Sequence, residues 1–185
     1  LTGMYMDDVI DVTQPQLLAG ISPCYRLEGG TYGKFSKGLF RVHPFEKVEM
    51  YAYAKPEDSD ALLQRILKLE EKICELLEIP YRVIRIADGD LSAPAYEKYD
   101  VEYWNPTDNT WRELTSCSNC TDYQARRLNI RYRNEAGELT HVHTLNGTAI
   151  TSSRTIVALL ENHQTADGGV RIPKALQQYY GGDTL

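Results

Sequence analysis

This sequence of 185 residues has no long apolar run, few cysteines and no excess of positive charge. No apolar run approaches the roughly 20 residues that a membrane span needs. The four cysteines are too few and too unevenly spaced for a disulfide framework, so we expect reduced thiols. With 20 Lys and Arg against 26 Asp and Glu, the chain lacks the basic face of a nucleic-acid-coating protein. These absences predict a cytoplasmic protein with no membrane partner.

What is present is ordinary for a globular protein, with 42% hydrophobic and 25% charged residues. This length favours a single domain with a sizeable core. Positive charge gathers locally around Lys34, Lys37 and Arg41, and again between residues 126 and 133. Because the chain opens with Leu1 in an apolar, turn-like stretch, we take it for part of a longer polypeptide.

Hydrophobic periodicity predicts a fold in which strands dominate. Apolar residues at helical spacing predict a helix between Pro56 and Pro80, and another that begins near Thr151. Extended patterns predict strands at residues 21–28, 38–53, 82–86, 99–104, 110–117, 128–132 and 141–145. Residues 1–19 receive no assignment, and the tail at 172–182 is expected to be irregular. Hairpin-joined strands with helices packed on one side define an α+β fold built on an antiparallel sheet.

Charged side chains share one face of the first predicted hairpin. Arg26 and Glu28 alternate along its first strand, while Arg41, Phe45 and Glu49 fall at even spacing on the returning strand. Such a face is poor core material, because unpaired buried charge is costly. We interpret these residues as facing a ligand; the alternative is a solvated face with cross-strand ion pairs.

Two more polar clusters follow along the chain. Glu113 and Ser116 approach a polar turn, where oxygen ligands for a hard cation such as Mg²⁺ are expected. Asn146 and Thr148 precede Arg154 at the start of the last predicted helix, where free N–H groups suit an anion. The alternatives are a capped turn and a capped helix with an exposed arginine.

The cysteine and histidine spacing allows one further interpretation. Cys117-x-x-Cys120 is followed by His141-x-His143, which is tighter than the usual histidine pair of a zinc finger. We therefore favour satisfied thiols in a turn over structural zinc. The sequence contains no glycine-rich phosphate loop of the Gly-x-Gly-x-x-Gly or Gly-Lys-Thr kind.

Three long segments resemble the motifs of seryl-tRNA synthetases. Residues 24–33 (CYRLEGGTYG) and 38–49 (GLFRVHPFEKVE) resemble motif 2 of that family, apart from Pro44, where members usually have Gln. The ATP and serine segment is matched by residues 112–127, and motif 3 by residues 143–162. The resemblance implies the class II aminoacyl-tRNA synthetase catalytic fold, an antiparallel sheet flanked by helices. It also implies an enzyme that activates serine with ATP and transfers it to tRNA(Ser).

The resemblance implies a role in ATP binding for four residues of the first hairpin and for Arg154. Arg26, implied as catalytic, would hold the α-phosphate of ATP and the serine carboxylate. Glu28 would accept from the adenine amino group, and Phe45 would stack on the adenine. Arg154, the second implied catalytic residue, would cover the other adenine face near the γ-phosphate, and Arg41 would grip the polyphosphate.

Metal and serine binding are implied for the other clusters. Glu113 and Ser116 would bind Mg²⁺ together with ATP. Glu49 would pair with the amino group of serine, and Asn146 and Thr148 would line the pocket for its side chain. A pocket that hydrogen-bonds a substrate hydroxyl rejects analogues that lack it by large factors.

The resemblance also implies macromolecular partners. Lys34 and Lys37, in the loop between Gly29 and Gly38, would meet the acceptor end of tRNA. The whole of residues 1–185 would form one partial catalytic domain, without the N-terminal tRNA-binding arm and motif 1 of the family, whose members are homodimers. Two alternatives stay open: a ligase that loads an amino acid onto a carrier protein, and a synthetase-like module that binds nucleotide without turnover.

Overall fold

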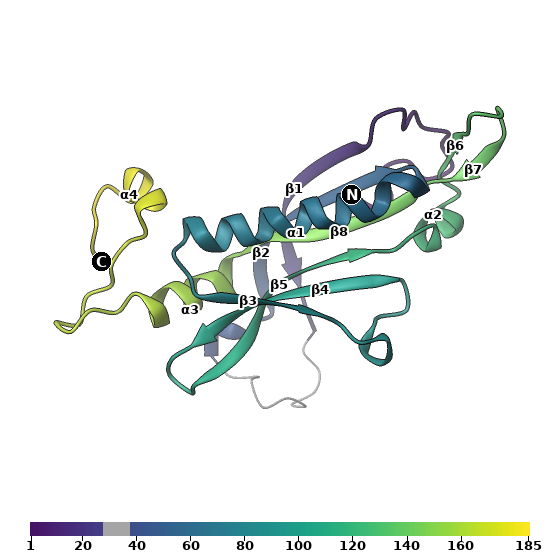
Figure 1. Ribbon diagram of the computed structural model, residues 1–185. Coiled ribbons are helices and arrows are strands. Elements are labelled where there is room, and N and C mark those ends of the chain that lie inside the picture. Colours follow the sequence, from purple (N-terminus) through teal and green to yellow (C-terminus); the bar gives the residue numbers. More distant parts are fainter. Residues whose placement is uncertain (28–37) are drawn as a thin grey trace.

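A six-stranded antiparallel sheet organises the computed structural model, which describes residues 1–27 and 38–185 (Figure 1). The strand order is β1-β2-β8-β5-β4-β3. The strands of this sheet are β1 (Gln16–Tyr25), β2 (Pro44–Ala54), β3 (Tyr81–Arg85), β4 (Glu97–Asn105), β5 (Thr110–Asn119) and β8 (His143–Thr151). A separate hairpin consists of β6 (Arg131–Arg133) and β7 (Leu139–His141). The predicted α+β class with an antiparallel sheet is confirmed.

Helices connect and cover these strands. The four α-helices of the described residues are α1 (Ser59–Leu76), α2 (Tyr123–Leu128), α3 (Ser152–Asn162) and α4 (Lys174–Tyr180). Three short 3-10 turns are η1 (Gly38–Phe40), η2 (Pro56–Asp58) and η3 (Asp88–Asp90). In Figure 1, α1 lies across the sheet, and the segment with α4 extends away at one end. None of the described helices is long and apolar enough to cross a membrane.

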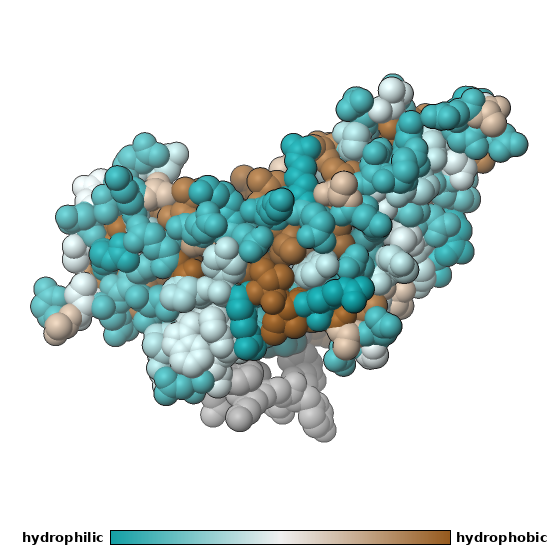
Figure 2. Space-filling view, in the orientation of Figure 1, coloured by the Kyte–Doolittle hydropathy of each residue, from teal (hydrophilic) through white to brown (hydrophobic). Residues whose placement is uncertain are grey.

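The sequence around α1 explains its bounds. Pro56 opens the preceding 3-10 turn, where its missing N–H costs nothing, and α1 follows directly. The buried apolar face then packs against β8 and β5. The helix ends before Glu78, which has a positive φ of 55°. Charged residues occupy its outer face, which is largely hydrophilic in Figure 2, with apolar residues gathered beneath the helix.

Two apolar cores lie on opposite faces of the sheet, and β2 passes between them. Ala52 and Ala54 face the larger core under α1, whereas Tyr51 and Tyr53 face a smaller one. All four side chains are buried, which is the expected result of strand alternation between two covered faces. The N-terminal segment and α2 supply the smaller core, so the prediction that helices cover only one side is wrong.

The first hairpin also differs from the prediction. β1 begins at Gln16 and ends at Tyr25, so Arg26 follows the strand. β2 begins only at Pro44, because Gly38 has a φ of 71° and opens a 3-10 turn instead of an extended stretch. Arg41 therefore lies in a turn and does not share the β2 face with Phe45.

Two further predicted elements differ near the C-terminal end. The hairpin predicted between residues 128–132 and 141–145 is shorter in the structure and consists of β6 and β7. Residues 143–145 join the main sheet instead, since Leu145 is buried in the core under α1. The tail predicted to be irregular contains α4, which starts after Pro173 and ends at Gly181 with a φ of 84°.

α1 packs closely against the sheet at Gly147 on β8. A Cβ there would overlap Cγ2 of Ile66 and lie 2.8 Å from Oε1 of Glu70. We expect Gly147→Ala to lower the free energy of unfolding by about 1–3 kcal/mol, as overpacked cores do. Urea denaturation measures this change. Gly89→Ala is the control, since nothing lies within 4 Å of its added Cβ; equal losses in the two variants would contradict the packing argument.

Candidate active site

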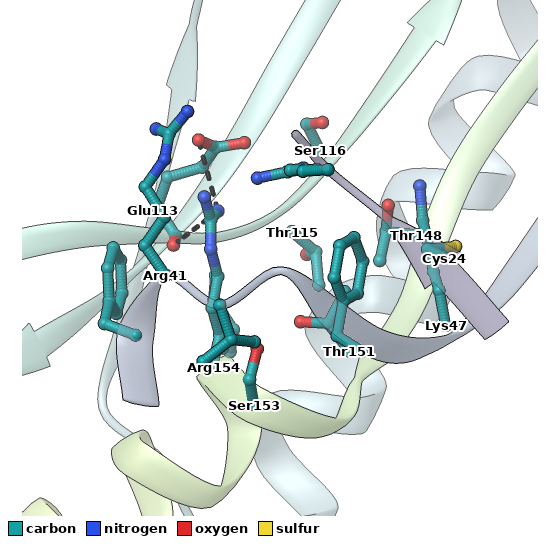
Figure 3. A pocket seen from close by; sticks show the side chains of 15 residues that line it. Cys24, Arg41, Lys47, Glu113, Thr115, Ser116, Thr148, Thr151, Ser153 and Arg154 are labelled. Carbon is teal, nitrogen blue, oxygen red and sulfur yellow. Dashed lines mark hydrogen bonds and ion pairs between the residues drawn. The ribbon is translucent and has the colours of Figure 1, made fainter. Parts of the chain in front are cut away.

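A pocket with a volume of about 510 Å³ opens on the face of the sheet opposite α1. It lies between the end of β1, the turn after η1, β2, β5, β8 and the first turn of α3 (Figure 3). The labelled residues that line it are Cys24, Arg41, Lys47, Glu113, Thr115, Ser116, Thr148, Thr151, Ser153 and Arg154; Arg26, Phe40, Val42, Phe45 and Leu114 complete the set. Most of the polar residues predicted from the sequence therefore meet in one place.

Arg154 ties the start of α3 to the edge of β5. Its Nη1 donates to the carbonyl oxygen of Glu113 at 3.0 Å and lies 3.3 Å from Oε2 of the same residue, as the dashed lines in Figure 3 show. The guanidinium also stands 4.9 Å from the centroid of the Phe40 ring. The arrangement holds a cation and a carboxylate side by side at the pocket wall.

Hydrogen bonds of the backbone directly after β1 hold Arg26 at the pocket wall opposite Arg154. Its N–H donates to the carbonyl of His43 at 2.9 Å, and His43 Nδ1 lies 3.1 Å from the carbonyl of Arg26. The Arg26 guanidinium stands 4.9 Å from the centroid of the Phe45 ring. The hairpin thus brings Arg26 and Phe45, both predicted separately to bind ATP, into contact.

Glu49 is the centre of a second group of contacts. Its carboxylate accepts from Nδ2 of Asn146 at 3.1 Å and from Oγ1 of Thr148 at 3.4 Å. Lys47 places its Nζ 2.6 Å from the same carboxylate. The pairing of β2 with β8 shifts register between Val48 and Glu49, and such irregularities re-aim side chains near sites. The predicted set of Glu49, Asn146 and Thr148 is therefore one hydrogen-bonded cluster.

Glu49 and Asn146 line a second cavity of about 390 Å³, whereas Thr148 lines the larger pocket. The two cavities adjoin through Lys47 and Cys24. Gln124 of α2 also lines the second cavity, and its Oε1 accepts from the Tyr51 hydroxyl at 2.8 Å and from the Thr144 hydroxyl at 2.7 Å. Two donors on one oxygen leave the amide nitrogen of Gln124 as the end free to donate. The cavity is therefore lined by one carboxylate and by amide groups that donate and accept hydrogen bonds.

The pocket offers two oxygen donors suited to a hard cation. Glu113 and Ser116 both line it from β5. Among the residues that the structure describes, no group of three or more His, Cys, Asp or Glu side chains could hold a metal. One carboxylate and one hydroxyl fit Mg²⁺, which keeps several waters and is usually shared with substrate phosphates. The four cysteines are free thiols.

Some predicted and unpredicted residues remain to be placed. Glu28, Lys34 and Lys37 lie outside the described residues. Lys47 and Phe40 were missed by the sequence analysis. Lys47 could have been found, since it stands two residues from both Phe45 and Glu49 on the same face of β2. Phe40 could not, because its position depends on the 3-10 turn η1.

The fold and this site together define a class. Residues 1–163 match the family model described as tRNA synthetase class II core domain (G, H, P, S and T). The chain belongs to this family of class II tRNA synthetase core domains. The relatives and solved structures that it resembles include seryl-tRNA synthetases.

The similarity to these proteins is high but covers part of their length. A serine–tRNA ligase of Dictyoglomus thermophilum is 53% identical over 98% of this chain and 43% of its own length. The crystal structure of seryl-tRNA synthetase from Pyrococcus horikoshii complexed with ATP superposes with a TM-score of 0.94 at 51% identity, over 99% of this chain and 41% of that one. The cytoplasmic serine–tRNA ligase of Naegleria fowleri in complex with AMP gives 0.90 at 39%, over 99% and 44%. The chain spans about two fifths of the length of these relatives.

The cationic wall of the larger pocket predicts polyphosphate binding. We expect inorganic tripolyphosphate to bind, and Arg154→Met to weaken it by about tenfold or more, since a charge-assisted hydrogen bond contributes about 1.5–3 kcal/mol. Methionine keeps the apolar stem beside Phe40 and removes the charge. Titration calorimetry measures the affinity. Arg126→Met is the matched control, because Arg126 pairs with Asp122 outside the pocket; equal weakening in both variants would refute the prediction.

Proposed function

We propose that this chain is the catalytic portion of a serine–tRNA ligase, which activates serine with ATP and transfers the seryl group to tRNA(Ser). The observation that carries the proposal is the cluster of Asn146 and Thr148 around the Glu49 carboxylate, next to an arginine-rich pocket. An acidic group beside small polar side chains suits an amino acid with a hydroxyl. The arginines suit the phosphates of ATP.

Serine recognition follows from the chemistry of that cluster. The Glu49 carboxylate would receive the ammonium group of serine, in place of part of its contact with Lys47. Asn146 and Thr148 would offer hydrogen-bond partners to the hydroxyl. Glu49 alone selects no particular amino acid, since every one has an amine, so discrimination rests on the hydroxyl partners.

The first reaction needs no nucleophilic side chain. The serine carboxylate attacks the α-phosphorus of ATP in line, pyrophosphate leaves, and seryl-adenylate forms. Arg26 would neutralise the α-phosphate and orient the serine carboxylate, while Arg41 and Arg154 would hold the outer phosphates. Phe45 would carry the adenine ring, and Glu28 would accept from its amino group.

Glu113 and Ser116 would hold Mg²⁺ with the ATP phosphates. When bound, the ion supplies positive charge that neutralises the polyphosphate. The Arg154 contact to Glu113 keeps this carboxylate turned along the pocket wall. ATP and Mg²⁺ are thus the expected cosubstrate and cofactor.

The second step acylates a 3′-terminal hydroxyl of tRNA, which attacks the carbonyl of seryl-adenylate and releases AMP. Lys34 and Lys37 would meet the phosphates of the acceptor end. We also propose a cytoplasmic homodimer for the full-length protein. The relatives named serine–tRNA ligase support the tRNA partner, and the family resemblance alone supports the dimer.

Serine-dependent exchange of pyrophosphate into ATP tests the activation step on the natural protein that contains this sequence. We expect exchange with serine, and little with threonine, alanine or glycine. Glu49→Gln should lower kcat/KM for serine by about 10- to 150-fold, the equivalent of a charged hydrogen bond worth about 1.5–3 kcal/mol. The KM for ATP should change little.

Glu46→Gln is the matched control, because Glu46 is an exposed carboxylate of the same strand that lies outside the larger pocket. Exchange with alanine or glycine in place of serine would favour a ligase that loads a carrier protein. ATP binding without exchange for any amino acid would leave a nucleotide-binding module.

A further inference from the structure

A buried carboxyl lies directly behind the pocket, on the other face of the sheet. Glu70 of α1 is 1% exposed. Its Oε2 accepts from the hydroxyl of Thr115 on β5 at 2.8 Å. Its Oε1 would lie 2.8 Å from a Cβ on Gly147 of β8, and this oxygen has no hydrogen-bond partner within the described part of the chain. The Thr148 backbone amide is near enough to favour the ionised form.

The described pairing of the two strands that Glu70 touches ends at Gly147. β5 and β8 pair through Cys117 with Gly147, Ser118 with Asn146, and Asn119 with Leu145. Towards the pocket the described pairing of these two strands stops.

Both strands are also irregular there. β5 shifts register against β4 between Val101 and Glu102, which leaves Leu114 as an extra residue. β8 shifts against β2, which leaves Ala149 as the extra one. Beyond the pair of Cys117 with Gly147, no described ladder pair fixes the spacing between β5 and β8.

We propose that Glu70 is a positioning residue that bridges β5 and β8 behind the pocket. Through Thr115 it holds the strand of Glu113 and Ser116, and at Gly147 it meets the strand of Thr148. The carboxyl sets the spacing between the side chains that face ATP and those that face the amino acid. Its effect on turnover rests on the proposed function, whereas its effect on strand spacing does not.

The surroundings keep this carboxyl protonated at neutral pH. Burial raises the pKa of Glu70 to about 8, against the smaller lowering effect of the Thr115 hydrogen bond. Negative charge on Glu49 of β2 and Asp100 of β4 acts in the same direction as burial. The neighbouring Cys117 thiol has its own pKa raised by burial and stays neutral. A protonated carboxyl avoids a buried charge, while its Oε2 still accepts from Thr115.

Two substitutions separate bridging from simple packing. Glu70→Gln keeps the shape, one acceptor and a donor, whereas Glu70→Ala removes all three. In the exchange assay we expect Glu70→Ala to lower kcat/KM by about 10- to 100-fold, with the KM values for ATP and serine rising together, because misplaced groups lose orientation. Glu70→Gln should stay within about threefold of wild type, since the amide restores the hydrogen bond.

Glu75→Ala is the matched control on the same helix, because Glu75 is exposed and pairs only with Lys72 among its described contacts. It should stay within about twofold of wild type, as surface changes do. Wild-type kinetics in folded Glu70→Ala would overturn the proposal. So would equal impairment of the Gln and Ala variants.

Amide hydrogen exchange tests the bridge without turnover. In Glu70→Ala, amides of residues 115–118 and 146–148 should exchange about tenfold faster or more, while those of β3 and β4 keep their rates. Unchanged protection at these amides would overturn the proposal. If Glu70→Ala does not fold, Thr115→Val removes the same hydrogen bond at nearly equal volume, and the same two outcomes apply. If the wild type showed no serine-dependent exchange of pyrophosphate into ATP, the proposed function would be refuted. The amide hydrogen exchange would still decide whether Glu70 bridges the two strands.

A pH titration of stability checks the protonation state. The folded protein keeps the Glu70 proton up to about pH 8, while the unfolded chain releases it near the ordinary value of 4.5. Stability is therefore fully present below the unfolded value and falls as pH rises through that interval. We expect the urea midpoint of the wild type to fall between about pH 5 and pH 8 relative to that of Glu70→Gln. Parallel curves for the two proteins would contradict a protonated Glu70.

Discussion

The close approach of α1 to β8 at Gly147 is the contact on which the rest of the site depends. A strand residue without a side chain lets the helix lie against the sheet, with Ile66 and Glu70 in the space a Cβ would fill. Alternation along β8 then turns the residues on either side of Gly147, Asn146 and Thr148, to the opposite face. Gly147 therefore faces the helix, while its two neighbours on β8 meet Glu49 on the other face of the sheet.

The electrostatics of the site follow from this arrangement. The chain is acidic overall, yet the larger pocket collects arginines from three separate places: Arg26 after β1, Arg41 after η1 and Arg154 in α3. Local geometry decides the charge that a ligand meets, whereas net charge describes the whole surface. Glu49 pairs with Lys47 and lines the smaller cavity, which none of these arginines lines, so the neighbouring cavities differ in charge.

Periodicity in the sequence was enough to predict α1, α3, the β4–β5 hairpin and the antiparallel class, because each is a long pattern with clear turn or helix signals. It failed for Arg41, whose place depends on the conformation of Gly38. Motif residues that lie on strands are close together, as the sequence predicted. Glu49, Asn146 and Thr148 are an example. Glu70 was hidden among the charges of its helix, although it falls at helical spacing from Ile66 and Cys74, on the buried face.

The burial of β2 changes along its length. Its last four residues, 51–54, are buried between the two cores, whereas Pro44 at its start is exposed and Phe45 lines the pocket. β2 is therefore packed between the two cores at its C-terminal end only. Side chains of its other end that line the pocket, Phe45 and Lys47 among them, can change with little effect on either core. Substrate preference in such a domain can evolve separately from its folding.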